Sequence, residues 1–325
     1  MRTKFVSKLK ILIPISLILT ACVETPSVVK PESPPATITP STSKNPCDNV
    51  GKLNNEAQVF FQQGKHELAK QALGTAIQIC PSYAKSYNNL AEIYLAKGDK
   101  DKAIEYYRKA LEINPNLSEA WNGLGELYYK QGQFPLSIEA HLHACKTDKD
   151  SKQRVEELLK DNRYTVTEDG EILDKESLLL LYDEQRRQAI NDMISACGLR
   201  GLNRIKSAVV FRNFEFERGK ATLKSGSELQ LETLAAALIN LPDKTVKIYG
   251  HTDSQPFPNT TPSESRRLNK ELSLARAKSV ADKLISSGVS SNRIITKGFG
   301  QEKPLVSGKN PTTWAKNRRV EIEVD

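Results

Sequence analysis

The feature that most constrains this chain is an internal repeat with a period of 34 residues. Four sets of small residues or prolines recur at this interval: Gly64, Gly98 and Gly132; Ala76, Ala110 and Ala144; Ala69, Ala103 and Ser137; Pro81 and Pro115. Each unit holds two stretches of helical periodicity, with small residues where the helices would cross. A single helical hairpin cannot bury its apolar face. We therefore expect three stacked hairpins over residues 49–149.

This period and residue pattern resemble the tetratricopeptide repeat. The resemblance implies an all-α superhelix whose concave side, lined by the first helix of each hairpin, binds a peptide or partner protein. The expected groove residues are Lys85, Asn88, Glu92, Glu119, Asn122 and Glu126. Their mixed charge indicates no ligand class, and a plain spacer remains the alternative role of the repeats.

Residues 1–21 have the pattern of an export signal. Four basic residues precede an apolar run, Ile11 to Leu19, that is too short to cross a bilayer. The next residues, Leu19-Thr20-Ala21-Cys22, resemble a bacterial lipobox, which implies cleavage before Cys22 and its acylation, including by palmitate. An ordinary signal peptide is the alternative. Val23, rather than Asp, favours a lipid anchor in the outer membrane, with the protein facing the periplasm.

Two segments connect these parts. Residues 22–48 are rich in Pro, Ser and Thr and predict a tether, with a reach of roughly 3.1 Å per residue in polyproline II geometry. Residues 150–206 predict a helical connecting region: a capping helix at Val155, a small hairpin about Asp169-Gly170, and one long helix from Ser177 to Ala196. We assign no activity to this region.

Residues 207–325 alternate between strand and helix patterns. The expected strands are 209–216, 245–249, 293–300 and 318–324, and the expected helices are 225–241, with Leu229 facing inward, and 269–284. The order β-α-β-α-β-β predicts an α/β sandwich with one helical layer. The fold class is therefore multidomain, with an all-α superhelix followed by an α/β sandwich.

Three motifs in this last region occur in a recognisable order. They are Gly250-His-Thr-Asp253, the run N-x-x-L-S-x-x-R-A-x-x-V-x-x-x-L from Asn269 to Leu284, and Asn317-Arg-Arg-Val-Glu-Ile322. Together they resemble the OmpA-like domain of the OmpA, Pal and MotB proteins. The resemblance implies non-covalent binding of meso-diaminopimelate in peptidoglycan. The implied binding residues are Asp253, Arg276, Asn269, Thr252 and Leu272.

The chemistry of that ligand explains the two charged residues. The free end of diaminopimelate carries an ammonium and a carboxylate on one carbon. Asp253 would accept from the ammonium and Arg276 would donate two parallel hydrogen bonds to the carboxylate, which together exclude a lone amine such as lysine. Asn269 is expected to cap the helix beside Arg276. An internal Asp253–Arg276 ion pair is the alternative.

The spacing of the two charges departs from the common pattern of the family. Asp253 and Arg276 are 23 residues apart, more than in the commonest members. Residues 254–268 resemble the longer loop of stator proteins of the MotB type, so the rim of the pocket is less predictable than its charges.

Enzyme and nucleic-acid functions are disfavoured. A wall hydrolase needs paired carboxylates or a metal, and His141 and His143, two apart on a helix, do not share a face. We therefore predict no enzyme, no cofactor and no metal. The chain has a net charge of +8, and most of it lies between Lys206 and Asp325, a stretch that holds twenty basic and thirteen acidic residues. Aromatic residues are not interleaved with the basic ones there. This pattern fits an anionic wall or membrane surface better than nucleic acid.

Four cysteines remain after Cys22, and an even number in an oxidising compartment predicts two disulfides. Antiparallel packing of the first hairpin would bring Cys47 to Cys80, and Cys145 with Cys197 follows by elimination. Two functions remain open. One is a peptidoglycan-binding outer-membrane lipoprotein that presents its repeats to a protein partner. The other is an assembly factor or stator-like component of an envelope machine, in which the repeats are primary.

Overall fold

The computed structural model describes residues 46–160, 162–168, 171–199, 201, 204–212, 214, 216 and 219–325. The chain divides into two units, Met1–Lys44 and Asn45–Asp325, and all the described helices and strands belong to the second unit. The predicted signal, the lipobox with Cys22 and nearly all of the tether lie outside the described residues. Among the described residues, every helix is too short or too polar to cross a membrane.

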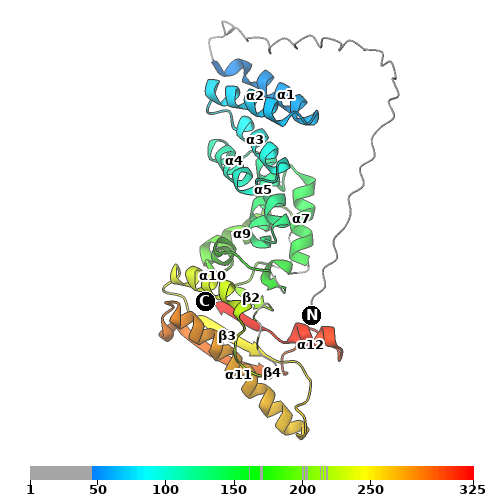
Figure 1. Ribbon diagram of the computed structural model, residues 1–325, viewed down its shortest axis with the longest axis vertical. Coiled ribbons are helices and arrows are strands. Elements are labelled where there is room, and N and C mark those ends of the chain that lie inside the picture. Colours follow the sequence, from blue (N-terminus) through cyan, green and yellow to red (C-terminus); the bar gives the residue numbers. More distant parts are fainter. Residues whose placement is uncertain are drawn as a thin grey trace, which may run out of the picture. The chain divides into compact units, whose positions relative to one another are not determined.

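The repeats form three helical hairpins (Figure 1). These are α1 (Val50–Gln62) with α2 (His66–Ile79), α3 (Ala84–Ala96) with α4 (Lys100–Ile113), and α5 (Ser118–Lys130) with α6 (Phe134–Ala144). Gly64, Gly98 and Gly132 make the turns, with φ of 73°, 81° and 75°. Only glycine adopts this backbone without strain, which explains its recurrence. The predicted hairpins are confirmed, and α7 (Lys149–Lys160) follows them as the expected capping helix.

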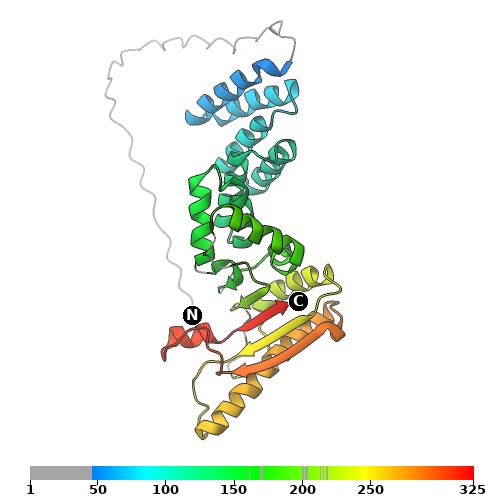
Figure 2. The ribbon, with the colours of Figure 1, turned by 180° about the vertical axis from the view of Figure 1, so that it is seen from behind.

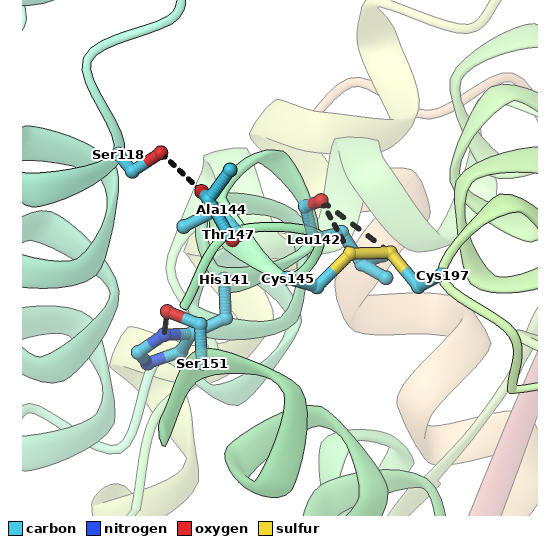
Figure 3. The surroundings of a disulfide bond; sticks show 8 residues. All are labelled: Ser118, His141, Leu142, Ala144, Cys145, Thr147, Ser151 and Cys197. Atoms are coloured by element: carbon cyan, nitrogen blue, oxygen red, sulfur yellow. Dashed lines mark hydrogen bonds between the residues drawn. A yellow bond between two sulfur atoms is a disulfide. The ribbon is translucent and has the colours of Figure 1, made fainter. Parts of the chain in front are cut away.

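Both predicted disulfides are present. Cys47, in a short 3₁₀ helix before α1, is joined to Cys80 at the end of α2, with a Cα–Cα distance of 5.2 Å. Cys145 follows α6 and Cys197 follows α9 (Glu184–Ala196), with their Cα atoms 6.0 Å apart (Figure 3). The second disulfide therefore ties the last hairpin to the connecting region.

The connecting region differs from its prediction. The long helix is two helices, α8 (Lys175–Tyr182) and α9, because Asp183 is extended and its side chain accepts from Arg186 N at 2.8 Å, capping α9. The predicted turn at Asp169-Gly170 lies outside the described residues. The strand before it, β1 (Val166–Thr167), pairs with β2 (Ala208–Phe211), parallel to it.

The C-terminal region is a five-stranded sheet with helices on one face (Figure 2). Its order is β1-β2-β5-β3-β4, with β3 (Val246–His251), β4 (Ile294–Gly300) and β5 (Val320–Val324). The strands β3 and β4 are parallel, and β5 is antiparallel to both β2 and β3. The predicted α/β layers are confirmed. The first predicted strand is shorter than expected, because Phe216 makes only an isolated bridge with Leu223.

Three helices accompany the sheet: α10 (Glu228–Ile239), α11 (Pro262–Ser286) and α12 (Pro311–Asn317). The buried stripe predicted for α11 is confirmed, since Ala277, Val280 and Leu284 are fully buried. Leu229 is expected to face inward but is 58% exposed, because it lies on the side of α10 opposite the buried residues Gln230, Leu231 and Leu234. The helix α12 lies between β4 and β5 and was not predicted.

The connecting region packs against this sheet. Tyr182 at the end of α8 is fully buried, and its hydroxyl donates to the backbone oxygen of Ile322 in β5 at 3.2 Å. Gln230 of α10 donates to the backbone oxygen of Leu173, just before α8, at 3.1 Å. The segment after the repeats is therefore part of the same packed core as the sheet.

We expect acid to destabilise the protein through His141. This side chain is fully buried in α6, with Nδ1 at 3.0 Å from Ser151 Oγ (Figure 3), and burial lowers its pKa to about 4. The unfolded state has a pKa near 6.5 and binds more protons below that pH. The free energy of unfolding should therefore fall by up to about 1.4 kcal/mol per pH unit from pH 6.5 to 4. Urea unfolding at several pH values should show that the free energy of unfolding changes less with pH in His141→Gln than in the parent. An unchanged dependence on pH would contradict this assignment.

Candidate functional site

A cavity of about 890 Å³ lies beyond the carboxyl end of β3. All five residues implied by the sequence resemblance line it, namely Thr252, Asp253, Asn269, Leu272 and Arg276. Two of them follow β3 and the other three lie on α11. The packing of α11 on the sheet therefore decides whether the site forms.

Two glycines allow α11 to lie directly on the strands. A Cβ on Gly250 would overlap the backbone oxygen of Ser273, and one on Gly298 would lie 2.5 Å from Leu274 N. Ser273 fixes the contact, because its hydroxyl accepts from Gly300 N at 2.8 Å. Arg276, three residues later, is thereby held near the strand ends.

Gly250→Ala is therefore expected to destabilise the domain by about 3 kcal/mol, because its methyl group would meet backbone that cannot rotate away. Urea unfolding measures the loss. Gly74→Ala in α2 is the control, since nothing lies near its added methyl group and it should be neutral or stabilising. Equal stability of Gly250→Ala and the parent would show that α11 lies farther from the sheet.

Asp253 lies in the loop after β3, as predicted, and is 7% exposed. Its Oδ2 accepts from Arg318 Nη1 at 2.8 Å, and its Oδ1 accepts from Gln255 N at 2.8 Å. Arg318 belongs to the third sequence motif, just before β5. The carboxylate is thus held on both oxygens and oriented at the cavity wall.

Among the residues that the structure describes, no carboxylate is paired with Arg276. Arg276 is 7% exposed, its guanidinium carbon lies 5.0 Å from the centre of the Phe216 ring, and its Nε donates to Lys220 O at 3.2 Å. Burial lowers the pKa of Arg276, and the charge of Arg318 lowers it further, while Asp253 opposes both. No ion pair joins Arg276 to Asp253, although both belong to the described residues. The alternative of an internal Asp253–Arg276 pair is replaced by an Asp253–Arg318 pair.

The prediction that Asn269 caps a helix is wrong. The helix α11 begins at Pro262, where the Thr261 hydroxyl accepts from Glu264 N at 3.3 Å. Thr261-Pro-Ser-Glu264 is a capping sequence, so much of the predicted 254–268 loop is helical. Asn269 lies inside the helix, where its Nδ2 donates to Ser265 O at 3.1 Å and to Gln255 O at 3.4 Å. Its role is to hold the loop.

Thr252 offers a further polar group. It is 4% exposed, and its hydroxyl has no hydrogen-bond partner within the part of the chain that the structure describes. Its backbone N–H donates to Gly300 O at 2.9 Å, which fixes the residue beside the cavity. Buried hydroxyls are normally bonded, so this one is suited to a ligand.

Sequence reasoning missed several lining residues. They are Arg318, Phe216, Lys220 and Lys224, whereas the loop Gln255–Pro258 belongs to the long loop expected at the rim. Arg318 was in a motif already recognised and only its role was missed. Phe216 and Lys220 had no local signal, because their contact with Arg276 spans about sixty positions of the chain.

The groove predicted on the repeats contains two adjoining cavities of about 380 and 650 Å³ that share Glu92 and Glu119. Lys85 and Asn88 line the first and Asn122 lines the second, as predicted. Asn88 Nδ2 donates to Glu92 at 3.1 Å. Glu126 lines neither cavity, and it is paired with Arg154 at 3.0 Å. Among the described residues, no cluster of His, Cys, Asp and Glu is arranged to hold a metal ion.

Family models match both regions. The OmpA family matches residues 215–318, and tetratricopeptide repeat models match residues 57–98, 84–117 and 106–139. These are structural or binding families rather than enzyme families.

Three relatives are similar to the C-terminal part. The probable lipoprotein YiaD of Escherichia coli is 38% identical over 110 residues, which is 34% of this chain and 47% of that protein. The peptidoglycan-binding protein ArfA of Mycobacterium tuberculosis is 43% identical over 95 residues, which is 29% of this chain and 27% of that protein. Motility protein B of Bacillus subtilis is 32% identical over 108 residues, which is 33% of this chain and 40% of that protein. The chain spans less than half of each relative. It is a protein with tetratricopeptide repeats followed by a C-terminal domain of the OmpA family.

Proposed function

We propose that the C-terminal domain binds peptidoglycan non-covalently through the free end of meso-diaminopimelate. The observation that carries this proposal is that Asp253 and Arg276 line one cavity, nearly buried, without pairing with each other. The ligand end is a zwitterion whose two charges sit on one carbon. Its ammonium suits Asp253, and its carboxylate suits the two terminal nitrogens of Arg276.

The electrostatics of the site favour such a ligand. Burial and Arg318 lower the pKa of Arg276, so a ligand carboxylate beside the guanidinium would stabilise its charged form. The side chain of Arg318 is 45% exposed, so its ion pair with Asp253 contributes little free energy. A ligand ammonium can therefore replace Arg318 as the partner of Asp253 at little cost. The Thr252 hydroxyl is available as a third partner.

The pocket does not suit hydrolysis. Asp253 is the single carboxylate among the described lining residues, and it is already ion-paired. Cleavage of the glycan needs a second acid at a defined separation. The relative ArfA is named a peptidoglycan-binding protein, which also supports binding.

Sedimentation with insoluble peptidoglycan tests the proposal. The protein should pellet with the wall, and free meso-diaminopimelate should release it, whereas Nα-acetyl-lysine amide at the same concentration should not. This blocked lysine carries the side-chain ammonium without a neighbouring carboxylate. Failure to pellet, or equal release by both compounds, would reject the assigned ligand.

The cellular setting belongs to the same proposal. We place the protein on the outer membrane, anchored through acylated Cys22 and facing the periplasm, and the lipoprotein relative YiaD supports a lipid anchor. Incorporation of labelled palmitate, lost in Cys22→Ala, and fractionation of the two membranes check this assignment. Incorporation of the label into Cys22→Ala as well as the parent would contradict the lipid anchor.

The repeats are proposed to hold a protein partner in the groove about Glu92 and Glu119. The likeness to motility protein B keeps the second candidate, a stator-like or assembly component, in view. Pull-down with and without residues 49–149 tests whether the repeats hold a partner, because a plain tether loses no partner when the repeats are removed.

A further inference from the structure

The groove on the repeats is lined by the first helix of each hairpin, α1, α3 and α5, and by the start of α7. Its two cavities have volumes of about 380 and 650 Å³ and meet at Glu92 and Glu119, which line both. A ligand that fills the two cavities therefore contacts these two carboxylates.

The groove is acidic, although the chain as a whole is basic. The charged side chains that line it are four acids, Glu92, Glu119, Asp148 and Asp150, and two bases, Lys85 and Lys149. The net charge of the chain is +8. The negative charge is therefore a local property of this surface, and such a surface attracts cations.

Glu92 is bonded to an amide rather than to a cation. Asn88 Nδ2 donates to its carboxylate at 3.1 Å, and among the described residues no Lys, Arg or His forms an ion pair with it. Burial raises the pKa of Glu92, the hydrogen bond from Asn88 opposes this change, and the charge of Glu119 adds to it. A ligand cation would stabilise the charged form of Glu92. Glu119 meets Lys85 only at 3.9 Å, with both side chains more than half exposed, so that pair is weak.

Asn88 offers an uncharged acceptor beside Glu92. This side chain is 4% exposed and lines the smaller cavity. Its Nδ2 is bonded to Asn89 and Glu92, whereas its Oδ1 has no hydrogen-bond partner in the part of the chain that the structure describes. Buried amide oxygens are normally bonded, so this one is suited to a ligand donor. The backbone N–H groups of a helix are already paired within the helix, and an extended segment with free N–H groups therefore suits this oxygen better.

The two ends of the groove differ in chemistry. At α1, the exposed amides of Asn55 and Gln58 line the smaller cavity, and amides both donate and accept, as the main chain of an extended peptide does. At the start of α7, the carboxylate of Asp148 is fixed, because its Oδ1 accepts from Asp150 N at 2.9 Å and its Oδ2 from Ser151 Oγ at 3.1 Å. One end therefore suits a main chain and the other a positive charge.

We propose that the groove binds an extended segment of a protein partner that carries lysine or arginine side chains. This inference rests on the proposed role of the repeats in holding a partner. A cationic side chain of the segment lies at Glu92 and Glu119, and its main chain lies along Asn55, Gln58 and Asn88.

Fluorescence anisotropy of the full chain with three labelled octapeptides tests the inference. The peptides alternate alanine with lysine, with glutamate or with serine. We expect the lysine peptide to bind about tenfold more tightly than the other two, although the net charge of the chain favours the glutamate peptide. N-methylation of its alanines removes main-chain donors and keeps the charge, and it should weaken binding as well.

Glu92→Gln should weaken binding of the lysine peptide by about fivefold, because the substitution removes the charge and keeps the size of the side chain. Glu112→Gln is the matched control. It removes the same charge from an exposed position on α4 that lines neither cavity of the groove, so binding should not change.

Several results would overturn the inference. Equal binding of the three peptides, or tighter binding of the glutamate peptide, would show that the groove does not select a cation. Equal losses in Glu92→Gln and Glu112→Gln would show attraction by charge in general and not binding in the groove. An unchanged affinity after N-methylation would remove the main chain from the contact.

The pull-down with and without residues 49–149 separates this inference from the proposed role of the repeats. If none of the peptides binds but the repeats still capture a partner, the basic segment is wrongly assigned and the proposed role stands. If the peptides and the pull-down both fail, the proposed role is rejected together with the inference.

Discussion

Arg276→Ala is expected to weaken binding to peptidoglycan by about 2 to 4 kcal/mol, because the ligand carboxylate would be left buried without a partner. The side chain is nearly buried against Phe216, so water does not replace it well. Asp253→Ala is expected to weaken binding by a similar amount, because the ligand ammonium would lose its hydrogen-bond acceptor. Sedimentation with peptidoglycan measures both losses, and circular dichroism should show that both variants stay folded.

The two variants should differ in selectivity. Arg276→Ala should no longer prefer diaminopimelate over Nα-acetyl-lysine amide, whose single charge is the side-chain ammonium. Asp253→Ala should no longer prefer it over pimelate, which carries carboxylates without an ammonium. Lys297→Ala, an exposed position on β4, is the charge-matched control for Arg276→Ala. If both folded variants pellet like the parent, the clamp is wrongly assigned.

Loss of the Cys145–Cys197 disulfide is expected to lower the free energy of unfolding by about 4 kcal/mol, from the entropy of a closed loop of this length. The two cysteines are 52 residues apart and join the last hairpin to the end of α9. The paired substitution to Ser avoids a free thiol. Urea unfolding of that variant, compared with the parent under oxidising conditions, measures the effect.

The Cys47–Cys80 bond provides the matched comparison. It spans 33 residues and confines only the first hairpin. Its removal should therefore act on α1 and α2 alone and leave unfolding of the C-terminal sheet unchanged. Equal effects of the two paired substitutions on the sheet would show that the second disulfide does not link the regions mechanically.

The repeats could be predicted because their rules are local. A 34-residue period, glycines at the turns and alanines at the helix crossings specify each hairpin from its own residues. The first disulfide followed from the same hairpin geometry. The predicted long helix runs across Asp183 because good helix formers lie on both sides of this capping residue, Leu178–Leu181 before it and Glu184–Ala189 after it.

The sequence predicts the two charged residues of the site but not the side chains that hold them in place. Motifs placed Asp253 and Arg276 together, and the structure confirms that both line one cavity. The Asp253–Arg318 pair joins positions 65 residues apart. The start of α11 differs from the sequence prediction because its capping sequence at Thr261 lies in a stretch rich in Pro, Thr and Ser, which is typical of a loop.

What the sequence by itself determined is the identity of the modules, since periodicity, turn residues and short motifs depend on neighbours in the chain. Only the tertiary structure decided that β1 joins the sheet, that Phe216 lies beneath Arg276, and that the loop Gln255–Pro258 forms a fixed wall. Each of these is a contact between distant segments. Such contacts depend on how whole helices and strands pack, which no local pattern encodes.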